Sequence, residues 1–345
     1  SSTKIKTSSA SDQYGNFSID YLALALPINK FGFGFGIIPY SSVGYSLQSK
    51  NENGDLSYRY RGNGGINRVF FGFGYQLFKG LKIGIDTHYN FGNISNTSIA
   101  YGYNDQGQLL QYQSRDERRS DLGGFSYNLG IILNQKLSKS YELMASFTYT
   151  PESKITSENN NQFSTISIDA NQVEFVQSTY EIDLEAISLA RTKLILPSKI
   201  SIGAGLGKPR KWFLGFDYTL LEASKFSHRF VEIENSSFED ASSLSVGGFF
   251  IPKYDSFSSY WKRIVFRSGI RFENTGLVVN NESIDEFGIS FGVGLPVGRL
   301  FSNANIGFEW GKRGTTNANL VEENFYNISI SLSLNERWFE KRKFN

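Results

Sequence analysis

The feature that most constrains this chain is an alternation of apolar with small or polar residues, which has a period of two and recurs from end to end. In residues 327–334, Ile328, Ile330 and Leu332 alternate with asparagine and serine. Residues 287–295 alternate phenylalanine, isoleucine and valine with glycine and serine. Successive side chains of a β-strand point to opposite faces, so this period predicts strands with one apolar face each. Helical spacing appears nowhere with comparable strength, and the sequence therefore predicts an all-β fold.

Composition excludes several classes of function. The chain of 345 residues has 35 Lys and Arg against 33 Asp and Glu, a net charge of +2 that does not point to nucleic acid. It has no cysteine, which excludes disulfides, thiolate metal sites and cysteine nucleophiles. The two histidines, His88 and His228, stand in no metal-ligand or catalytic-triad spacing. We therefore expect no enzyme activity, no metal and no cofactor.

Strand and connection lengths favour a membrane barrel over the alternative, a large soluble β-protein. No apolar run approaches the roughly 18 residues of a membrane-spanning helix. The expected strands have about 9 to 14 residues, which is longer than usual for soluble sheets and suited to a tilted membrane crossing. The connections expected at 79–80 and 208–211 are short, whereas those at 95–121 and 157–191 are long and polar. Short turns at one end and long loops at the other are typical of outer-membrane β-barrels.

We therefore predict one antiparallel transmembrane β-barrel over residues 1–345, integral to the bacterial outer membrane, with short turns in the periplasm and long loops outside. The alternation gives about thirteen strands, and because bacterial barrels normally have an even number, residues 1–8 are expected to complete about fourteen. Residues 335–345, NERWFEKRKFN, are expected to form a charged periplasmic tail. Further long connections are expected at 49–66, 223–240 and 274–284, and residues 109–121 and 163–184 are candidates for strand ends above the membrane.

Three hairpins carry a resemblance to a known family. Residues 123–156, GGFSYNLGIILNQKLSKSYELMASFTYTPESKIT, form the first of them. Residues 196–226 place Leu-Pro before a strand, then a short basic turn, a tryptophan and an Asp-Tyr strand, and residues 66–94 form a third hairpin. In order and extent these hairpins resemble the FadL family of outer-membrane hydrophobic-compound transporters. The abundance of asparagine, glycine and tyrosine is similar to a Bacteroidota branch of that family.

The resemblance implies a monomeric fourteen-stranded barrel with an internal ligand pocket and an N-terminal hatch. Ligands of such proteins leave sideways through a gap at an inward kink of the third strand, and residues 31–48 occupy that place in order. The hatch signature Asn-Pro-Ala has no counterpart here, so a hatch lies upstream of residue 1 or is lacking. The long loops are polar, which departs from the apolar capture groove of the family.

The proposed lateral opening lies in the middle of the strand that begins FGFGFG. Pro39 has no backbone N–H for the ladder, and the serines and glycine after it tolerate a bend. A simple β-bulge that adds twist is the alternative. The residues assigned to the opening are Ile38, Pro39, Tyr40, Ser41, Ser42 and Gly44.

Four charged residues are expected in the lumen. Arg267 and Arg271 alternate with apolar residues and should point inward, as should Asp217 and Glu309. A guanidinium there binds a ligand carboxylate in a bidentate manner, or else joins an ion-pair network that holds the interior. The segment 115–119, RDERR, is interpreted as a lipopolysaccharide contact or as a solvated strand extension. The inward glycines leave room for a hatch or a ligand, or permit tight coiling: Gly32, Gly34, Gly36, Gly72, Gly74, Gly292 and Gly294.

Two functions follow from this interpretation. The first is passive uptake of hydrophobic or amphipathic small molecules, with lateral release through the kinked strand into outer-membrane lipid. The second is a non-transporting barrel that serves as a subunit of a larger outer-membrane complex, in secretion or assembly machinery. The first requires a small-molecule ligand and the second requires protein partners.

Overall fold

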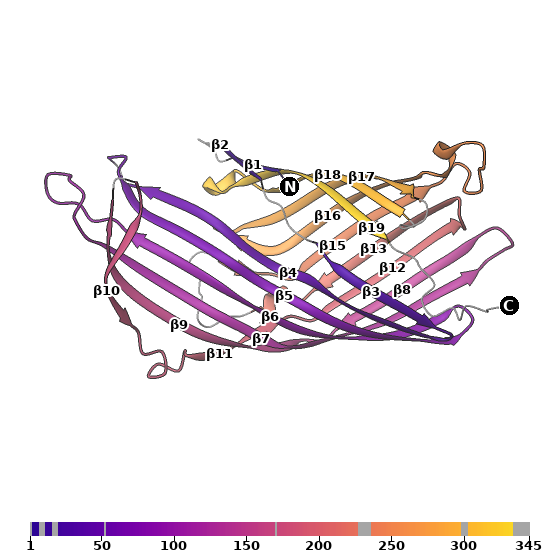
Figure 1. The fold of residues 1–345 in the computed structure, drawn as a ribbon, viewed down its shortest axis with the longest axis horizontal. Helices are drawn as coiled ribbons and strands as arrows, with labels where there is room; N and C mark the ends of the chain where they lie inside the picture. The colour runs from indigo at the N-terminus through magenta and orange to yellow at the C-terminus, as the bar shows by residue number, and fades with distance from the viewer. Residues whose placement is uncertain are drawn as a thin grey trace, which may run out of the picture.

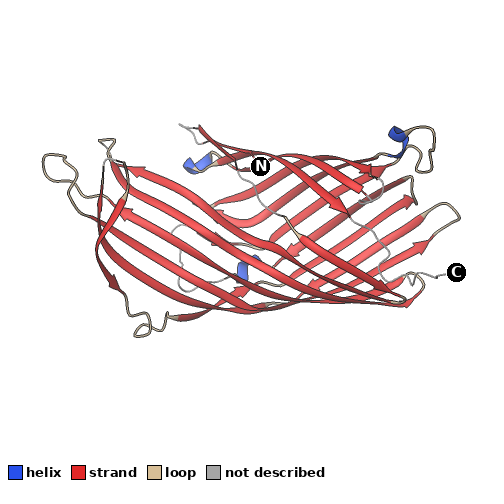
Figure 2. Cartoon of the chain, viewed as in Figure 1, coloured by secondary structure: helices blue, strands red, loops and turns tan. Residues whose placement is uncertain are grey.

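The computed structural model describes residues 2–6, 11–15, 20–51, 53–169, 171–226, 236–297 and 303–333. Nineteen strands of this part form one sheet, and Figure 2 shows that strands dominate the molecule. Among the described residues, no helix is long and apolar enough to cross a membrane. The strands are β1 Ser2–Lys6, β2 Ser11–Gly15, β3 Leu22–Ile28, β4 Phe31–Lys50, β5 Leu56–Phe78, β6 Leu81–Ala100, β7 Gln113–Lys136, β8 Glu142–Thr150, β9 Ser153–Ile168, β10 Glu174–Glu181, β11 Arg191–Leu196, β12 Lys199–Lys208, β13 Trp212–Leu221, β14 Ser236–Phe238, β15 Ala241–Phe250, β16 Val265–Val279, β17 Glu282–Pro296, β18 Asn303–Gly314 and β19 Glu322–Ser333. The short 3-10 turns are η1 Ala223–Lys225, η2 Tyr260–Arg263 and η3 Asn317–Asn319.

The strands pair antiparallel with their neighbours around a curved sheet. From β3 to β8 each strand pairs with the next, β8 pairs with β12, and the pairing continues through β13 and β15 to β19. β19 also pairs with β1, and β1 with β2. The pairing of β1 agrees with the first strand expected at residues 1–8. Figure 1 shows the sheet curling so that one face is concave, and we call this the lumenal face.

Two of the long strands are interrupted by proline. β8 ends just before Pro151 and β9 begins just after it, while β7 pairs with both. Pro197 separates β11 from β12 in the same way. Proline has no N–H to donate to the ladder, so the strand bends at that point and the pairing resumes beyond it.

The convex face carries a broad apolar band. Ile328 and Ile330 of β19 expose 69% and 73% of their surface, and Phe291 of β17 exposes 59%. The residues between them on the same strands, such as Ser329 and Ser290, belong to the other face. So much contiguous apolar surface is stable only against apolar surroundings, which a lipid bilayer provides.

One side of the sheet projects well beyond this band, and we call this projection the wing (Figure 1, left). β5 and β7 have 23 and 24 residues, whereas β18 and β19 have 12 each. Strand extension at 109–121 and 163–184 is confirmed, because β7 begins at Gln113 and β10 lies in the second range.

Several expected loops are instead mostly strand. β4 and β5 leave only residues 51–55 of the expected loop at 49–66, and β16 and β17 are joined at 280–281. The loop prediction at 49–66 was wrong because the wing residues there are largely polar, so the alternation that marks a half-buried strand disappears. At 274–284 the alternation is interrupted by a register shift between Asn274 and Val278, beyond which β16 and β17 pair again. The expected tail at 335–345 lies outside the described residues.

The buried apolar core is small and lies where the wing meets the rest of the wall. It brings together side chains from four strands, β5, β7, β9 and β11. Burying one such aliphatic side chain contributes about 1.5–3 kcal/mol, so this cluster fixes the wing to the barrel wall. Its members are Ile66, Leu122, Ile155, Leu194 and Leu196.

Candidate functional site

The middle of β4 contains a one-residue bulge at Tyr40. Pro39 pairs with Asn67 of β5 and Ser41 pairs with Ile66, so Tyr40 is the extra residue and the β4–β5 ladder continues on both sides. The extra residue turns the tyrosine ring over the Arg68 guanidinium, whose central carbon lies 3.9 Å from the ring centroid. A cation over an aromatic face at this distance is attractive. The strand break noticed in the sequence is therefore a bulge along this edge of β4.

Among the described residues, the opposite edge of β4 has no partner strand above Ile37. β3 pairs with β4 only as far as Leu22 and Ile37, and among the described residues β4 has no second partner from Ile38 to Lys50. All six residues assigned to the lateral opening lie on this open stretch. Along the other edge, Ile38, Pro39, Ser41, Ser42 and Gly44 pair with Arg68, Asn67, Ile66, Gly65 and Asn63 of β5.

Three glycines that the sequence analysis did not single out bend the wall beside the bulge. Gly64 has φ +112°, and a Cβ there would lie 2.1 Å from the carbonyl oxygen of Asn93. A Cβ on Gly92 would lie 2.1 Å from the carbonyl oxygen of Gly65, and a Cβ on Gly65 would lie 2.3 Å from that of Ser41. Only glycine permits this backbone contact, so these positions mark the corner at which the wing begins. The sequence signal that could have indicated this corner is the adjacent pair Gly64 and Gly65, which lies outside the alternating glycine runs such as FGFGFG.

A polar chain on the lumenal face connects the bulge to β7. Arg68 Nε donates to Asn90 Oδ1 at 2.8 Å, and Asn90 Nδ2 donates to Ser126 Oγ at 2.9 Å. Asn90 and Ser126 are almost fully buried, and buried polar groups of this kind are costly unless they are paired. Tyr40 is thereby held in a fixed position by Arg68 and the residues behind it.

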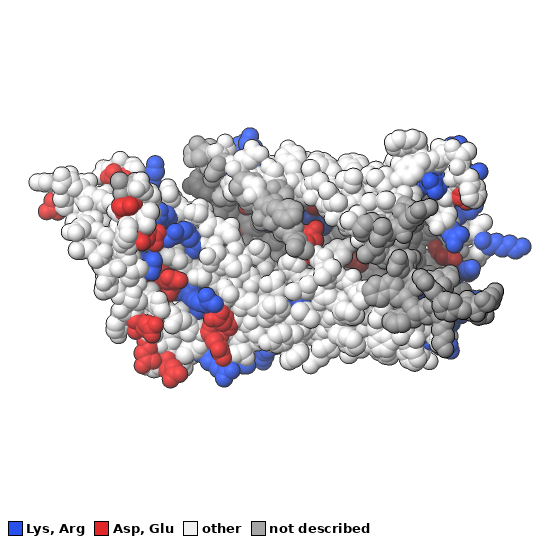
Figure 3. Space-filling view, in the orientation of Figure 1, with Lys and Arg blue, Asp and Glu red and all other residues white. Residues whose placement is uncertain are grey.

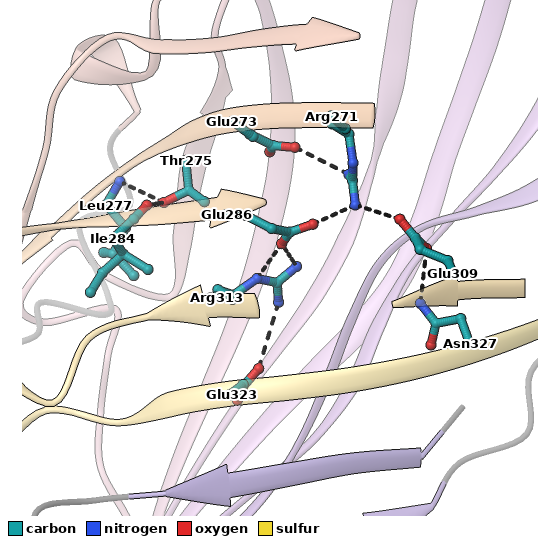
Figure 4. Close-up of polar contacts among 10 residues, drawn as sticks. All are labelled: Arg271, Glu273, Thr275, Leu277, Ile284, Glu286, Glu309, Arg313, Glu323 and Asn327. Atoms are coloured by element: carbon teal, nitrogen blue, oxygen red, sulfur yellow. Dashed lines mark hydrogen bonds and ion pairs between the residues drawn. The ribbon is translucent and has the colours of Figure 1, made fainter. Parts of the chain in front are cut away.

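A second, denser polar cluster spans β16 to β19 (Figure 4). Arg271 Nη2 contacts Glu286 at 2.5 Å and Glu309 at 3.1 Å, and its Nη1 contacts Glu273 at 3.2 Å. Arg313 also binds Glu286, whose side chain is only 2% exposed. The structure therefore brings together two of the predicted lumenal residues, Arg271 and Glu309, within an ion-pair network.

The other two predicted lumenal residues lie elsewhere. Arg267 donates to Asn305 Oδ1 at 3.0 Å and forms no ion pair within the described part of the chain. Its guanidinium occupies space that Gly294 leaves, because a Cβ on that glycine would lie 2.8 Å from Arg267 Nη1. Asp217 accepts from Thr219 Oγ1 at 3.2 Å, on a strand apart from the Arg271 cluster. At Gly294, the missing side chain makes room for an arginine.

Arg267 borders a cavity of about 970 Å³. The cross-strand register places it in a row with Phe213 and Phe249 on one side and with Gly292 and Gly307 on the other. The two phenylalanine rings lie with centroids 6.1 Å apart, and the glycines contribute no side chains. The result is a mainly apolar hollow with one cation at its border, of the size that holds a small organic molecule.

The wing carries arginines that are already paired. Arg59 and Arg115 both bind Glu174 of β10, at 2.8 Å and 3.5 Å, although three strands separate β5 from β10 in the sheet. The wing is therefore strongly curled. Arg119 of the RDERR segment pairs with Asp121 at 2.8 Å, and this hydrogen bond lowers the pKa of the Asp121 carboxyl. Within the described ranges, no three His, Asp or Glu side chains are arranged to hold a metal ion.

A family model described as BamG matches residues 1–345. The chain belongs to the BamG family. No curated protein matches the BamG-family chain. Among solved structures, the Pseudomonas putida toluene transporter TodX is similar, with a TM-score of 0.61 and 13% identity over 98% of this chain and 88% of that chain.

Two further solved structures have the same fold. The CymD monoaromatic hydrocarbon channel has a TM-score of 0.54 and 13% identity over 95% of this chain and 85% of its own. A Pseudomonas aeruginosa FadL homologue has a TM-score of 0.52 and 12% identity over 89% and 74%. At identities this low, the structural similarity shows a shared fold alone. This is the fold of the FadL-type proteins that the hairpins predicted.

Proposed function

We propose that this BamG-family protein is an outer-membrane channel for passive uptake of hydrophobic or amphipathic small molecules, which leave sideways beside β4. The observation that carries the proposal is the edge of β4 above Ile37, which has no partner strand among the described residues and lies next to a bulge that turns Tyr40 toward lumenal Arg68. The part of this edge before the wing begins, Ile38 to Ser41, belongs to the proposed membrane-spanning sheet, where unpaired backbone groups persist only beside water, ligand or protein.

The cavity beside Arg267 supports the same function. Burying an apolar ligand against Phe213 and Phe249 is favourable, and no covalent chemistry is needed for passive movement. The finer expectations are part of this proposal: a closed barrel of about fourteen strands, with the short turns in the periplasm and the wing outside the cell.

Deleting Tyr40 tests the lateral route. The deletion removes the extra residue, so β4 and β5 pair without a bulge, and the ring that covers Arg68 is lost. We expect accumulation of labelled toluene, the compound that TodX is described as transporting, to fall about fivefold or more in cells that depend on this protein. The matched control is Tyr40→Phe, which keeps both the bulge and the ring. Equal uptake by the deletion variant and the control, with both proteins folded in the membrane, refutes lateral release.

A second candidate function is that of a barrel subunit in a larger outer-membrane complex for secretion or assembly. The open β4 edge favours it as well, because an exposed strand edge accepts an extended strand from a partner. Native mass spectrometry after mild extraction from the native membrane separates the two candidates. A single barrel with a small lipid-sized adduct supports the channel, and a stoichiometric assembly without an adduct supports the subunit.

A further inference from the structure

The short-turn end of the molecule is strongly basic. Its described turns and the residues at their edges span 29–30, 79–80, 136–142, 208–211 and 251–264, and we call these residues the rim. Figure 3 shows Lys and Arg gathered at this end, at the right of the view, whereas both signs mix at the opposite end. The rim has two acidic residues, Glu142 and Asp255. Its basic residues are Lys30, Lys79, Lys136, Lys139, Lys208, Arg210, Lys211, Lys253, Lys262 and Arg263.

Within the part of the chain that the structure describes, the rim cations have almost no counter-ions. Among the described residues, the single ion pair on the rim joins Lys136 to Glu142, at 3.9 Å. Arg263 Nε is buried and has no hydrogen-bond partner within the described part. In the wing, by contrast, Arg59 and Arg119 hold carboxylates at 2.8 Å. Because the described residues supply carboxylates to the wing arginines and almost none to the rim, the rim cations are available to anions from outside.

Aromatic side chains lie on the same rim, in the turn that contains η2. Phe257 is fully exposed and Trp261 is 75% exposed. Arg263 lies over the Tyr260 ring, with its guanidinium carbon 5.4 Å from the centroid. Tryptophan and tyrosine concentrate at the depth of lipid headgroups, where one end of the ring is apolar and the other is wet.

The turn continues directly from the lipid-facing band. Phe250 is the last residue of β15 and Phe266 the second residue of β16, and the two pair with each other and are both exposed on the convex face. A turn that follows such residues lies at the boundary between acyl chains and headgroups. Its cations are therefore at the height of lipid phosphates, which favours a lipid over a soluble acidic protein as the occupant.

We infer that the rim binds the phosphodiester headgroups of anionic phospholipids, with Arg210, Lys253, Lys262 and Arg263 facing the phosphates and Trp261 inserted beside the acyl chains. The inference rests on the proposed insertion in a membrane and is independent of transport. A rim cation near an anionic lipid surface contributes attraction that adds over neighbouring charges.

The test measures lipid retention by the intact purified chain. The protein is delipidated in detergent, mixed with equal amounts of phosphatidylglycerol, phosphatidylethanolamine and lipid A, and examined by native mass spectrometry. We expect the wild type to retain phosphatidylglycerol in preference to phosphatidylethanolamine. The rim variant, with Arg210, Lys253, Lys262 and Arg263 all changed to Gln, should lose that retention by about tenfold or more.

A control variant removes the same charge from the opposite end. Arg118, Arg119, Arg191 and Lys193 are changed to Gln, and phosphatidylglycerol retention should stay at the wild-type level. Equal loss in both variants, or no preference of the wild type for phosphatidylglycerol, overturns the inference. Preferential retention of lipid A by the wild type overturns it too, because it assigns the phosphate to the other leaflet. None of these results bears on toluene uptake, so failure here is distinguishable from failure of the channel.

A second variant keeps the charges and tests the aromatic contribution. Trp261→Ser retains every rim cation but removes the ring that is proposed to lie beside the acyl chains. We expect the variant to retain less phosphatidylglycerol than the wild type does, while still preferring it to phosphatidylethanolamine. Unchanged retention would place Trp261 outside the lipid site and overturn that part of the inference. Circular dichroism of each variant verifies the β-fold.

Discussion

At the scale of single residues, glycines shape this wall because they leave space that neighbouring groups occupy. Gly294 leaves space for the Arg267 guanidinium, and Gly72 leaves space for the carboxylate of Asp86. Gly64 is different, because there the carbonyl oxygen of Asn93 fills the space and φ is positive. Glycine therefore has two roles in this chain: it accommodates polar lumenal side chains, and it permits the corner beside the bulge.

This difference yields a prediction for Gly64→Ala. The new Cβ would lie 2.1 Å from Asn93 O, on a residue with φ +112°, so we expect a loss of about 1–3 kcal/mol in unfolding free energy. The control is Gly44→Ala, where an added Cβ would meet no atom within 4 Å and φ is ordinary. Urea unfolding of the two variants measures the difference. A Gly64 variant as stable as the Gly44 variant would show that the corner is not strained.

At the scale of elements, four strands depend on one buried carboxylate. Glu286 of β17 binds Arg271 of β16 and Arg313 of β18, and Arg313 lies 4.0 Å from Glu323 of β19. Glu286→Gln removes the carboxylate that Arg271 and Arg313 share, while Glu273, Glu309 and Glu323 stay in place, so we expect destabilisation of about 2 kcal/mol, reduced from the buried-pair value because Arg271 is partly solvated. Glu158→Gln, which breaks the exposed 3.2 Å pair with Arg191, should cost less than about 1 kcal/mol. Equal urea midpoints for the two would contradict the proposed role of Glu286.

How much of the fold the sequence could predict depends on what surrounds the two faces of each strand. The band strands were predictable, because lipid on one side and a polar lumen on the other impose a period of two, as in β18 and β19. Wing strands such as β10 escape this signal, since water or polar neighbours lie on both faces. That Arg271 and Glu309 both face the lumen follows from the alternation within each strand, whereas their contact depends on register across β16 to β18. Register across strands decides that Glu286 contacts both arginines. It also decides that β4 pairs with β5 along its whole length but, among the described residues, with β3 only as far as Ile37.

At the scale of the whole molecule, the proposed route requires a lumen that stays open between the cavity and the β4 edge. Gly32 begins β4 on the lumenal face, and a Cβ placed there meets no atom within 4 Å. Gly32→Trp therefore adds a large ring to the lumen without forcing the backbone to move. We expect the variant to fold and to lower toluene uptake by about fivefold or more, because the ring occupies space that the ligand must cross.

The neighbouring residue provides the matched control. Phe31 is exposed on the convex face, so Phe31→Trp adds a similar ring that points toward lipid and should leave uptake unchanged. If Gly32→Trp transports like Phe31→Trp, the ligand does not pass Gly32 and the channel would have to lie elsewhere. If Gly32→Trp blocks uptake while deletion of Tyr40 does not, molecules enter the lumen but leave by a path other than the β4 edge. The two variants together therefore locate the entrance and the exit separately, which neither does alone.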